Sequence, residues 1–260
     1  MTGGDKYGPI IDTDRPQVAR LRSFLLGEKN FYSVDREFAV GLLIKDPGAD
    51  VAVRASRWFH DVATTALAES GVDQFLDLAA GFEPRVYRQA VKVHPDARVA
   101  YVDDDPVVLA HLRAHEPESQ WVAASPTDIG AILAGAKLDW TRPVAVSAIG
   151  AVEYIDDQAA TVAAMHELFA ALAPGSALVM CTPTPDRNPD QALAARQVYA
   201  SISDIRYRPR TLEEFREHFG GLVLDDQGIV APDRWRSPIE PLIKRPEMDV
   251  SSYAAVGRKP

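Results

Sequence analysis

Short apolar runs that alternate with helical segments constrain the fold of this chain more than any other feature of its sequence. Five of these runs read as strands, at residues 75–78, 98–103, 120–123, 143–149 and 177–181. Helical segments separate several of them, at residues 106–115, 128–133 and 157–172. Strands that alternate with helices are typical of a parallel sheet covered by helices. The sequence therefore predicts an α/β fold with a doubly wound sheet.

The residues before the first strand predict helices. Residues 1–15 are expected to form a flexible arm, followed by helices at 16–26, 34–44 and 51–70, with breaks at Gly27 and Gly71. We therefore divide the chain into an arm (1–15), a helical cap (16–70) and an α/β domain (71–260). Past the fifth strand we expect a helix at 190–202, a helix capped by Thr211, a strand at 222–224, an irregular strap at 232–246 and a last strand at 253–256.

Composition excludes several classes of protein. A length of 260 residues fits one principal domain. The 28 basic and 37 acidic side chains give a net charge of −9, which argues against a nucleic-acid partner. A single cysteine, Cys181, cannot close an intrachain disulfide, so we expect a reducing, cytoplasmic setting. Neither a secretory signal nor an apolar run long enough for a membrane span is recognised, so no membrane partner is expected.

Two strand ends carry the residues that point to a ligand. Asp77 is followed by a turn that contains Gly81, and Asp103 closes the next strand, beside Asp104. In doubly wound sheets, ligands bind at the carboxyl ends of the strands, where an acid at the second strand end accepts hydrogen bonds from a ribose diol. This pattern predicts a nucleoside site, with Asp103 as the ribose ligand. Asp77 has an alternative role as a strand-end cap for the loop amides.

The turn after the first strand distinguishes between nucleosides. A dinucleotide fingerprint requires three glycines, whereas only Gly81 is present here, and Glu83 would oppose a phosphate. NAD is therefore disfavoured. A turn with one glycine and an acid suits S-adenosylmethionine, which has a ribose and an amino-acid portion, carries cationic groups and lacks phosphate.

Longer stretches of the sequence resemble a known family. They comprise Ala19-Arg20, Leu25-Leu26-Gly27-Glu28-Lys29-Asn30-Phe31, Asp35-Arg36, Arg54-Ala55-Ser56-Arg57, Gln74-Phe75-Leu76-Asp77, the run from Tyr101 to His111, Leu172-Ala173-Pro174-Gly175-Ser176 and Arg234-Trp235-Arg236. With these motifs the chain resembles an actinobacterial branch of the class I S-adenosylmethionine-dependent methyltransferases that has a helical N-terminal signature. The resemblance extends from about residue 16 to residue 260.

The resemblance implies a Rossmann-like sheet whose N-terminal helices form a lid over S-adenosylmethionine. Residues near the methionine portion would be Arg20, Gly27, Asn30 and Tyr32, with Arg57 for its carboxylate. The adenine would lie against Ser125, Pro126, Thr127 and Asp128, and the sulfonium near Ala148 and Ile149. The chain departs from the family pattern at Ala79, where glycine is usual, and at Ser125, where an aspartate commonly reads the adenine amine and Asp128 is a substitute.

Alternatives remain for several of these residues. Arg20 and Arg57 suit helix-surface ion pairs as well as cofactor contacts. Glu153 could accept a proton from an acceptor or cap the following helix, and Tyr32 could orient the acceptor or pack between helices. His111 and His115 lack a third ligand, so no metal site is predicted.

These features predict an S-adenosylmethionine-dependent methyltransferase acting on a small molecule, in the setting of specialised metabolism. The alternatives are other chemistry on the same cofactor and a non-catalytic regulatory protein. The sequence leaves a homodimer open, with Trp235, expected to be exposed, and the strap as its interface.

Overall fold

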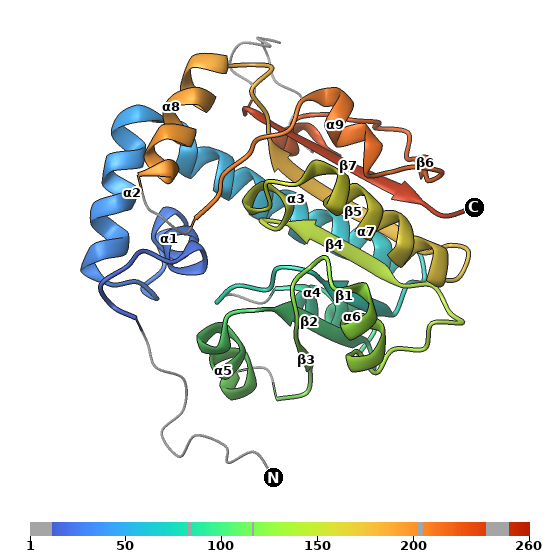
Figure 1. The fold of residues 1–260 in the computed structure, drawn as a ribbon. Coiled ribbons are helices and arrows are strands. Elements are labelled where there is room, and N and C mark those ends of the chain that lie inside the picture. Colours follow the sequence, from blue (N-terminus) through green and yellow to red (C-terminus); the bar gives the residue numbers. More distant parts are fainter. Residues whose placement is uncertain (1–11, 83–84, 116, 202–204, 238–249) are drawn as a thin grey trace.

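Seven strands form one sheet in the order β3-β2-β1-β4-β5-β7-β6 (Figure 1). The computed structural model describes residues 12–82, 85–115, 117–201, 205–237 and 250–260. The strands are β1 Gln74–Asp77, β2 Arg98–Asp103, β3 Gln120–Ala123, β4 Ala145–Ile149, β5 Ala177–Pro183, β6 Val223–Leu224 and β7 Ser252–Arg258. Each of the seven strands predicted from the sequence is present. The α/β, Rossmann-like fold class is thereby confirmed.

The sheet is parallel from β3 to β5, and its last two strands follow a different pattern. β7 lies between β5 and β6 and runs antiparallel to both. An antiparallel neighbour requires no crossover helix, and the described chain between β6 and β7 contains only the short 3₁₀ helix η2, Pro232–Arg234. The parallel direction that the sequence predicts for alternating strands and helices therefore holds for the first five strands, and no direction was predicted for the last two.

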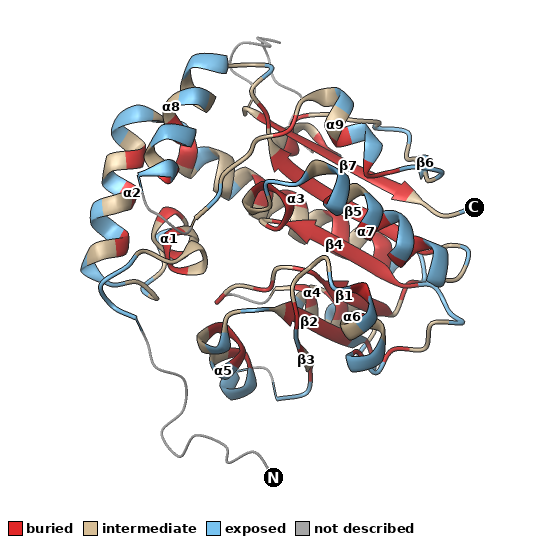
Figure 2. Ribbon diagram, in the orientation of Figure 1, coloured by how far each residue is buried: buried red, intermediate tan, exposed pale blue. Residues whose placement is uncertain are grey.

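Helices cover both faces of the sheet. α6 (Ile129–Gly135), α7 (Gln158–Ala171) and α9 (Leu212–Glu217) pack on one face, and α3 (Ala49–Glu69), α4 (Val86–Val93) and α5 (Pro106–His115) pack on the other. β1 and β4 are buried along their whole length, as Figure 2 shows for the centre of the sheet. This double burial explains why their sequences are apolar without alternation. α4 was not predicted, although Val86 and Ala90 form its buried face.

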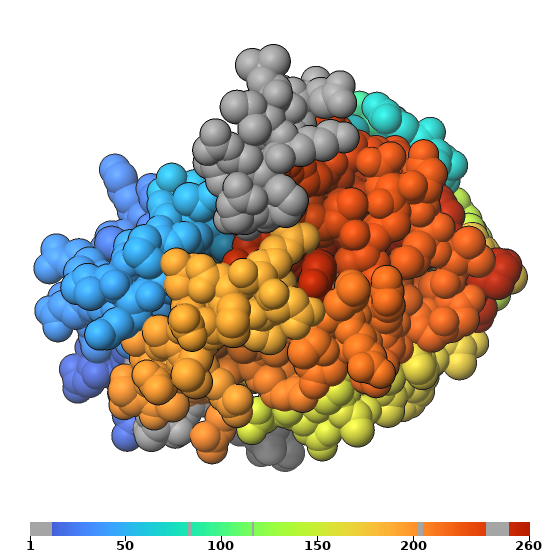
Figure 3. Space-filling view, turned by 90° about the horizontal axis from the view of Figure 1, so that it is seen from above, coloured from blue at the N-terminus to red at the C-terminus, as the bar shows by residue number. Residues whose placement is uncertain are grey.

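The first two helices belong to a smaller core that is separate from the cores on the two faces of the sheet. α1 (Val18–Leu25) and α2 (Ser33–Lys45) pack with α8 (Pro189–Ala200), through Leu21, Leu42 and Tyr199 among others. Figure 3 shows α8, in light orange, against the blue surface that includes α2. By contrast, α3 packs on the sheet through Phe59 and Leu67. The predicted cap of residues 16–70 is thus divided between two cores.

Trp235 is buried, contrary to the expectation from the sequence. Only 1% of it is exposed, its ring meets Phe59 edge to face, and its indole N–H donates to Asp225 Oδ2 at 3.0 Å. It therefore does not contribute to a dimer surface. Of the predicted arm and strap, residues 1–11 and 238–249 lie outside the described residues. No helix in the described part of the chain is both long and apolar enough to cross a bilayer.

Candidate functional site

The direction in which the sheet is built changes between β1 and β4. From β1 the chain adds β2 and β3 on one side, whereas β4 and β5 lie on the other. Three strands end beside this switch point, at Asp77 (β1), Asp103 (β2) and Ile149 (β4). A crevice outside the carboxyl ends of strands forms at such a position, because neighbouring connections leave it in opposite directions.

A cavity of about 390 Å³ occupies this crevice. The strand ends and their loops form its floor, through Asp77, Gly81, Asp103, Ser125 and Ile149 among others. Side chains of α1 and α3 form the opposite wall. The volume lies near the lower end of the range for sites that bind one drug-sized molecule.

The turn after β1 is tied to the end of β2. Gly81 has a φ of +62°, a left-handed conformation that glycine adopts without strain. Its N–H donates to Asp103 Oδ2 at 3.3 Å, and the N–H of Asp105 donates to Asp103 Oδ1 at 2.9 Å. Asp77 is buried and accepts from the N–H of Ala79 at 3.3 Å. The two strand-end acids therefore border one loop, as expected from the sequence.

The electrostatic setting of Asp103 is unusual for a carboxylate. Burial raises its pKa from 3.8 to about 7; the amides of Asp105 and Gly81 act against this rise, and the charges of Asp104 and Asp105 add to it. The ionised form, which accepts hydrogen bonds from hydroxyls, is thus present at neutral pH together with the acid form, and the side chain lies on the cavity wall. Asp104 also lines the cavity.

The loop after β3 forms the part of the cavity wall where the adenine is expected. Ser125 and Pro126 line the cavity. Thr127 lies behind them, with its hydroxyl 3.1 Å from that of Ser125. Asp128 is exposed and caps α6 by accepting from the N–H of Ala131 at 3.1 Å. Of the residues predicted here, the structure brings Ser125 to the cavity and uses Asp128 as a helix cap.

The arginines of the N-terminal helices differ in what they face. Arg20 is buried, and its Nε lies 2.8 Å from Asp35 Oδ2, away from the cavity. Arg57 lines the cavity and pairs with Glu28 at 3.1 Å. Arg22, which the sequence analysis did not single out, also lines it. Positions two apart on a helix lie about 200° apart, so Arg20 and Arg22 point in nearly opposite directions.

Other predicted residues lie outside the cavity wall. Gly27, with a φ of +78°, ends α1, and the N–H of Asn30 donates to Ser23 Oγ at 3.1 Å. Tyr32 is 41% exposed, and the guanidinium of Arg20 covers its ring at 5.1 Å. Ala148 is buried within β4, next to Ile149, which lines the cavity.

Glu153 and Tyr154 follow β4 on the 3₁₀ helix η1, Val152–Tyr154. Glu153 is 3% exposed and lies behind the cavity wall; burial raises the pKa of its carboxyl, and its Oε2 accepts no hydrogen bond from any described residue. Tyr154 lines the cavity instead. Its ring borders those of Tyr199 and Tyr207, at centroid distances of 6.0 Å.

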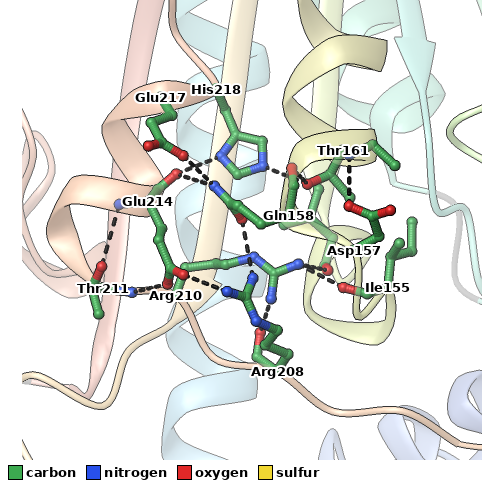
Figure 4. A network of polar contacts seen from close by, with 12 residues as sticks. Ile155, Asp157, Gln158, Thr161, Arg208, Arg210, Thr211, Glu214, Glu217 and His218 are labelled. Carbon is green, nitrogen blue, oxygen red and sulfur yellow. Dashed lines mark hydrogen bonds and ion pairs between the residues drawn. The ribbon is translucent and has the colours of Figure 1, made fainter.

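A polar network holds η1 from behind (Figure 4). Arg210 is fully buried and donates to three carbonyl oxygens, those of Arg208 (2.6 Å), Val152 (3.1 Å) and Ile155 (2.6 Å). The N–H of Arg208 donates to the carbonyl oxygen of Glu153 at 2.8 Å. The network thus fixes both ends of η1.

α9 anchors the outer part of this network. Its first turn is closed by a capping box between Thr211 and Glu214, and Glu214 also pairs with Arg208. Gln158, at the start of α7, donates to the carbonyl oxygen of Glu214 at 2.8 Å. His218 contacts Thr161 at 3.0 Å, and burial lowers the pKa of its imidazole to about 4, so it is neutral at physiological pH.

The cavity residues that the sequence did not assign to the cofactor site include Arg22, His60 and Tyr154. Arg57 and His60 are three positions apart on α3 and therefore share a face. Helical spacing from Arg57 was thus a signal for His60. For Arg22 and Tyr154 the signal was weaker, because the rotation of α1 and the path of η1 depend on long-range packing.

The cavity residues fit a nucleoside that bears an amino-acid portion. Asp103 offers acceptor oxygens for a diol, and Gly81 allows close approach of the backbone. His60 has a buried Nε2 to which no described residue is hydrogen-bonded, next to the acidic end of β1, and it lines the cavity. Within the described residues, no group of three or more His, Cys, Asp or Glu side chains is arranged to hold a metal ion.

A family model and two solved structures match this chain over almost its whole length. A model of the family described as S-adenosyl methyltransferase matches residues 5–260. The chain is similar to a DUF574 family protein from Streptomyces avermitilis, with 33% identity and a TM-score of 0.88 over 96% of this chain and 99% of that one. It is also similar to a proposed methyltransferase from Thermobifida fusca, with 31% identity and a TM-score of 0.86 over 95% and 96% of the two chains.

A curated relative from Mycolicibacterium paratuberculosis is named as a proposed S-adenosyl-L-methionine-dependent methyltransferase. It is 34% identical over 170 residues, which are 56% of this chain and 52% of the relative. The chain therefore spans about half the length of the curated relatives it matches.

Proposed function

The chain belongs to the S-adenosyl methyltransferase family, and from this premise we propose that it transfers a methyl group to a small molecule. The cofactor of the family is S-adenosylmethionine. When bound, it supplies a methyl group activated by the positive charge on its sulfur. The single observation that carries the proposal is the carboxylate of Asp103, beside the Gly81 bend, at the wall of the switch-point cavity.

The order of the strands suggests how the cofactor lies. Ser125 and Pro126 after β3 would border the adenine, Asp103 at the end of β2 would accept from the ribose hydroxyls, and the Asp77 to Gly81 turn after β1 would border the methionine portion. Charge-assisted hydrogen bonds to an ionised carboxylate are roughly twice as strong as neutral ones. Asp103 is therefore the main polar anchor in this proposal.

The chain's contribution to the reaction is positioning and exclusion of water. α1 covers the strand ends, so a ligand in the cavity would be shielded from solvent. Holding two reactants in line can supply several kcal/mol of the barrier reduction in a displacement. Tyr154 is the cavity phenol beside Ile155 and Ile205, and we place the acceptor on this side. We also propose that the acceptor is a small molecule of specialised metabolism.

Isothermal titration calorimetry with S-adenosylmethionine and S-adenosylhomocysteine tests cofactor binding. We expect both to bind, and Asp103→Asn to weaken both by about 10- to 100-fold through the lost charge-assisted bonds. Asp128→Asn is the matched control, because asparagine is an equally good N-cap and Asp128 does not line the cavity. Absence of heat with both ligands would refute the proposal.

Mass spectrometry then tests methyl transfer. Incubation with S-adenosylmethionine and candidate acceptors should yield a product 14 mass units heavier, a shift that follows from replacing H with CH₃. Tight binding with methylation of none of a broad acceptor panel would favour the alternative, a protein that binds the cofactor for a regulatory role or for other chemistry.

A further inference from the structure

Arg22 places a guanidinium over the end of β4, on the cavity side. The position is defined by Gly150, whose φ is +76°. A Cβ at residue 150 would lie 2.7 Å from Arg22 Cζ and 2.9 Å from its Nη1. The backbone conformation favours glycine here, and a side chain at this position would displace the guanidinium.

The other arginine that lines the cavity, Arg57, and two that lie outside its lining, Arg20 and Arg85, already have acidic partners. Arg20 pairs with Asp35 at 2.8 Å, Arg57 with Glu28 at 3.1 Å, and Arg85 with Asp61. Among the residues that the structure describes, no carboxylate lies within 4.0 Å of the Arg22 guanidinium. The charge of Glu153 acts on Arg22 without a close ion pair, so this cavity-lining cation can still pair with an anionic ligand group.

The surroundings of Arg22 keep it charged and oriented. Burial acts to lower its pKa, but Tyr154 and Glu153 raise it, and the net shift is upward. Tyr154 is also hydrogen-bonded to it. The network around Arg210 in turn holds η1, the short helix that contains Glu153 and Tyr154 (Figure 4). Contacts with η1, which the Arg210 network holds in place, therefore fix the position of the Arg22 guanidinium.

We propose that Arg22 binds the carboxylate of the cofactor's methionine portion. This inference rests on the proposed function and gives Arg22 the role that the family resemblance implied for Arg57. β2 and β4 are the two neighbours of β1, so their ends lie about 10 Å apart. In an extended cofactor, the path from the ribose hydroxyls through C5′ and the sulfur to the carboxylate covers a distance of that order. A ribose on Asp103 thus leaves the carboxylate near Gly150 and Arg22.

The test compares S-adenosylmethionine with its decarboxylated form, which lacks only the group in question. Calorimetry on the wild-type chain should show the intact cofactor binding at least 30-fold more tightly than the decarboxylated one. Arg22→Met should reduce this preference to threefold or less, while the affinity for the decarboxylated form changes little. Arg22→Lys should retain part of the preference, because it keeps the charge without the bidentate fork.

Two controls separate this inference from the proposed function. Arg57→Met should keep the full preference, and Asp103→Asn should weaken both ligands by the same factor. If Arg22→Met keeps the preference, the inference is overturned while cofactor binding stands. If the wild type binds neither ligand, the proposed function itself fails.

A second variant guards against misfolding of Arg22→Met. Gly150→Ala leaves every charge in place but forces the guanidinium to move, and circular dichroism and the thermal midpoint report whether each variant is folded. A folded Gly150→Ala protein should also lose most of the preference for the carboxylate. An unchanged preference in this variant would contradict the proposed position of Arg22.

Discussion

Asp103 shows how a residue's surroundings set its chemistry. An exposed aspartate is ionised at neutral pH, but burial and two neighbouring acids raise the pKa of this one to about 7. Backbone amides of Gly81 and Asp105 bond to it without neutralising it. The free protein therefore holds Asp103 as a mixture of acid and carboxylate at pH 7.

This pKa predicts a pH-dependent affinity for S-adenosylhomocysteine. The diol donates hydrogen bonds to the ionised form, so binding favours loss of the proton and weakens as the pH falls through 7. We expect affinity about tenfold lower at pH 6 than at pH 8, with no further gain above pH 8. Calorimetry across this range measures it. Asp103→Asn should bind weakly with a flat profile, and a wild-type pH profile retained in that variant would assign the titration to another group.

At the scale of elements, η1 depends on the chain segment that precedes α9. Arg210 donates to the carbonyl oxygens of Val152 and Ile155, which lie 58 and 55 residues away along the chain. Removal of this guanidinium leaves buried acceptors without partners, which is more costly than the loss of a surface ion pair. The wall that carries Tyr154 is thus held by a long-range contact.

We expect Arg210→Ala to lower the free energy of unfolding by about 3 kcal/mol. It should also weaken S-adenosylhomocysteine binding several-fold, because Tyr154 and Glu153 lose their support. Urea denaturation measures the first effect and calorimetry the second. Arg216→Ala, at an exposed position of α9, is the control and should stay within about 0.5 kcal/mol of wild type. Equal stability of the two variants would show that the network is dispensable.

At the scale of the whole molecule, the cavity lies between the strand ends of the sheet and the separately packed group of helices that includes α1. The sheet and its covering helices form the main cores, and α1, α2 and α8 form the smaller one. A ligand in the cavity would touch both, because its wall includes residues of α1 and of the strand ends. Binding should therefore stabilise their relative arrangement.

Hydrogen exchange with mass spectrometry tests this coupling. With saturating S-adenosylhomocysteine, we expect exchange to slow by about tenfold or more in α1 and in the loop at residues 77–82. β7, which is remote from the cavity lining, should exchange at an unchanged rate and serves as the internal control. Protection of the strand-end loop without protection of α1 would show that α1 does not close over the ligand.

The sequence by itself determined the local elements and the first ligand residues. The strands could be located because a strand buried on both faces is apolar along most of its length. Asp77, Gly81 and Asp103 could be placed together because they lie at strand ends and in a turn, which the local sequence encodes. α4 was missed since its short apolar pattern follows a turn without a clear start signal.

Only the tertiary structure decided which side chains face one another across the molecule. It turned Arg22 rather than Arg20 toward the cavity, buried Trp235 and placed β7 between β5 and β6. It also placed Glu153 behind the cavity wall, where Tyr154 lines the cavity instead. These outcomes depend on helix rotation and on contacts between residues far apart in the chain. A pattern of neighbouring residues carries little information about either.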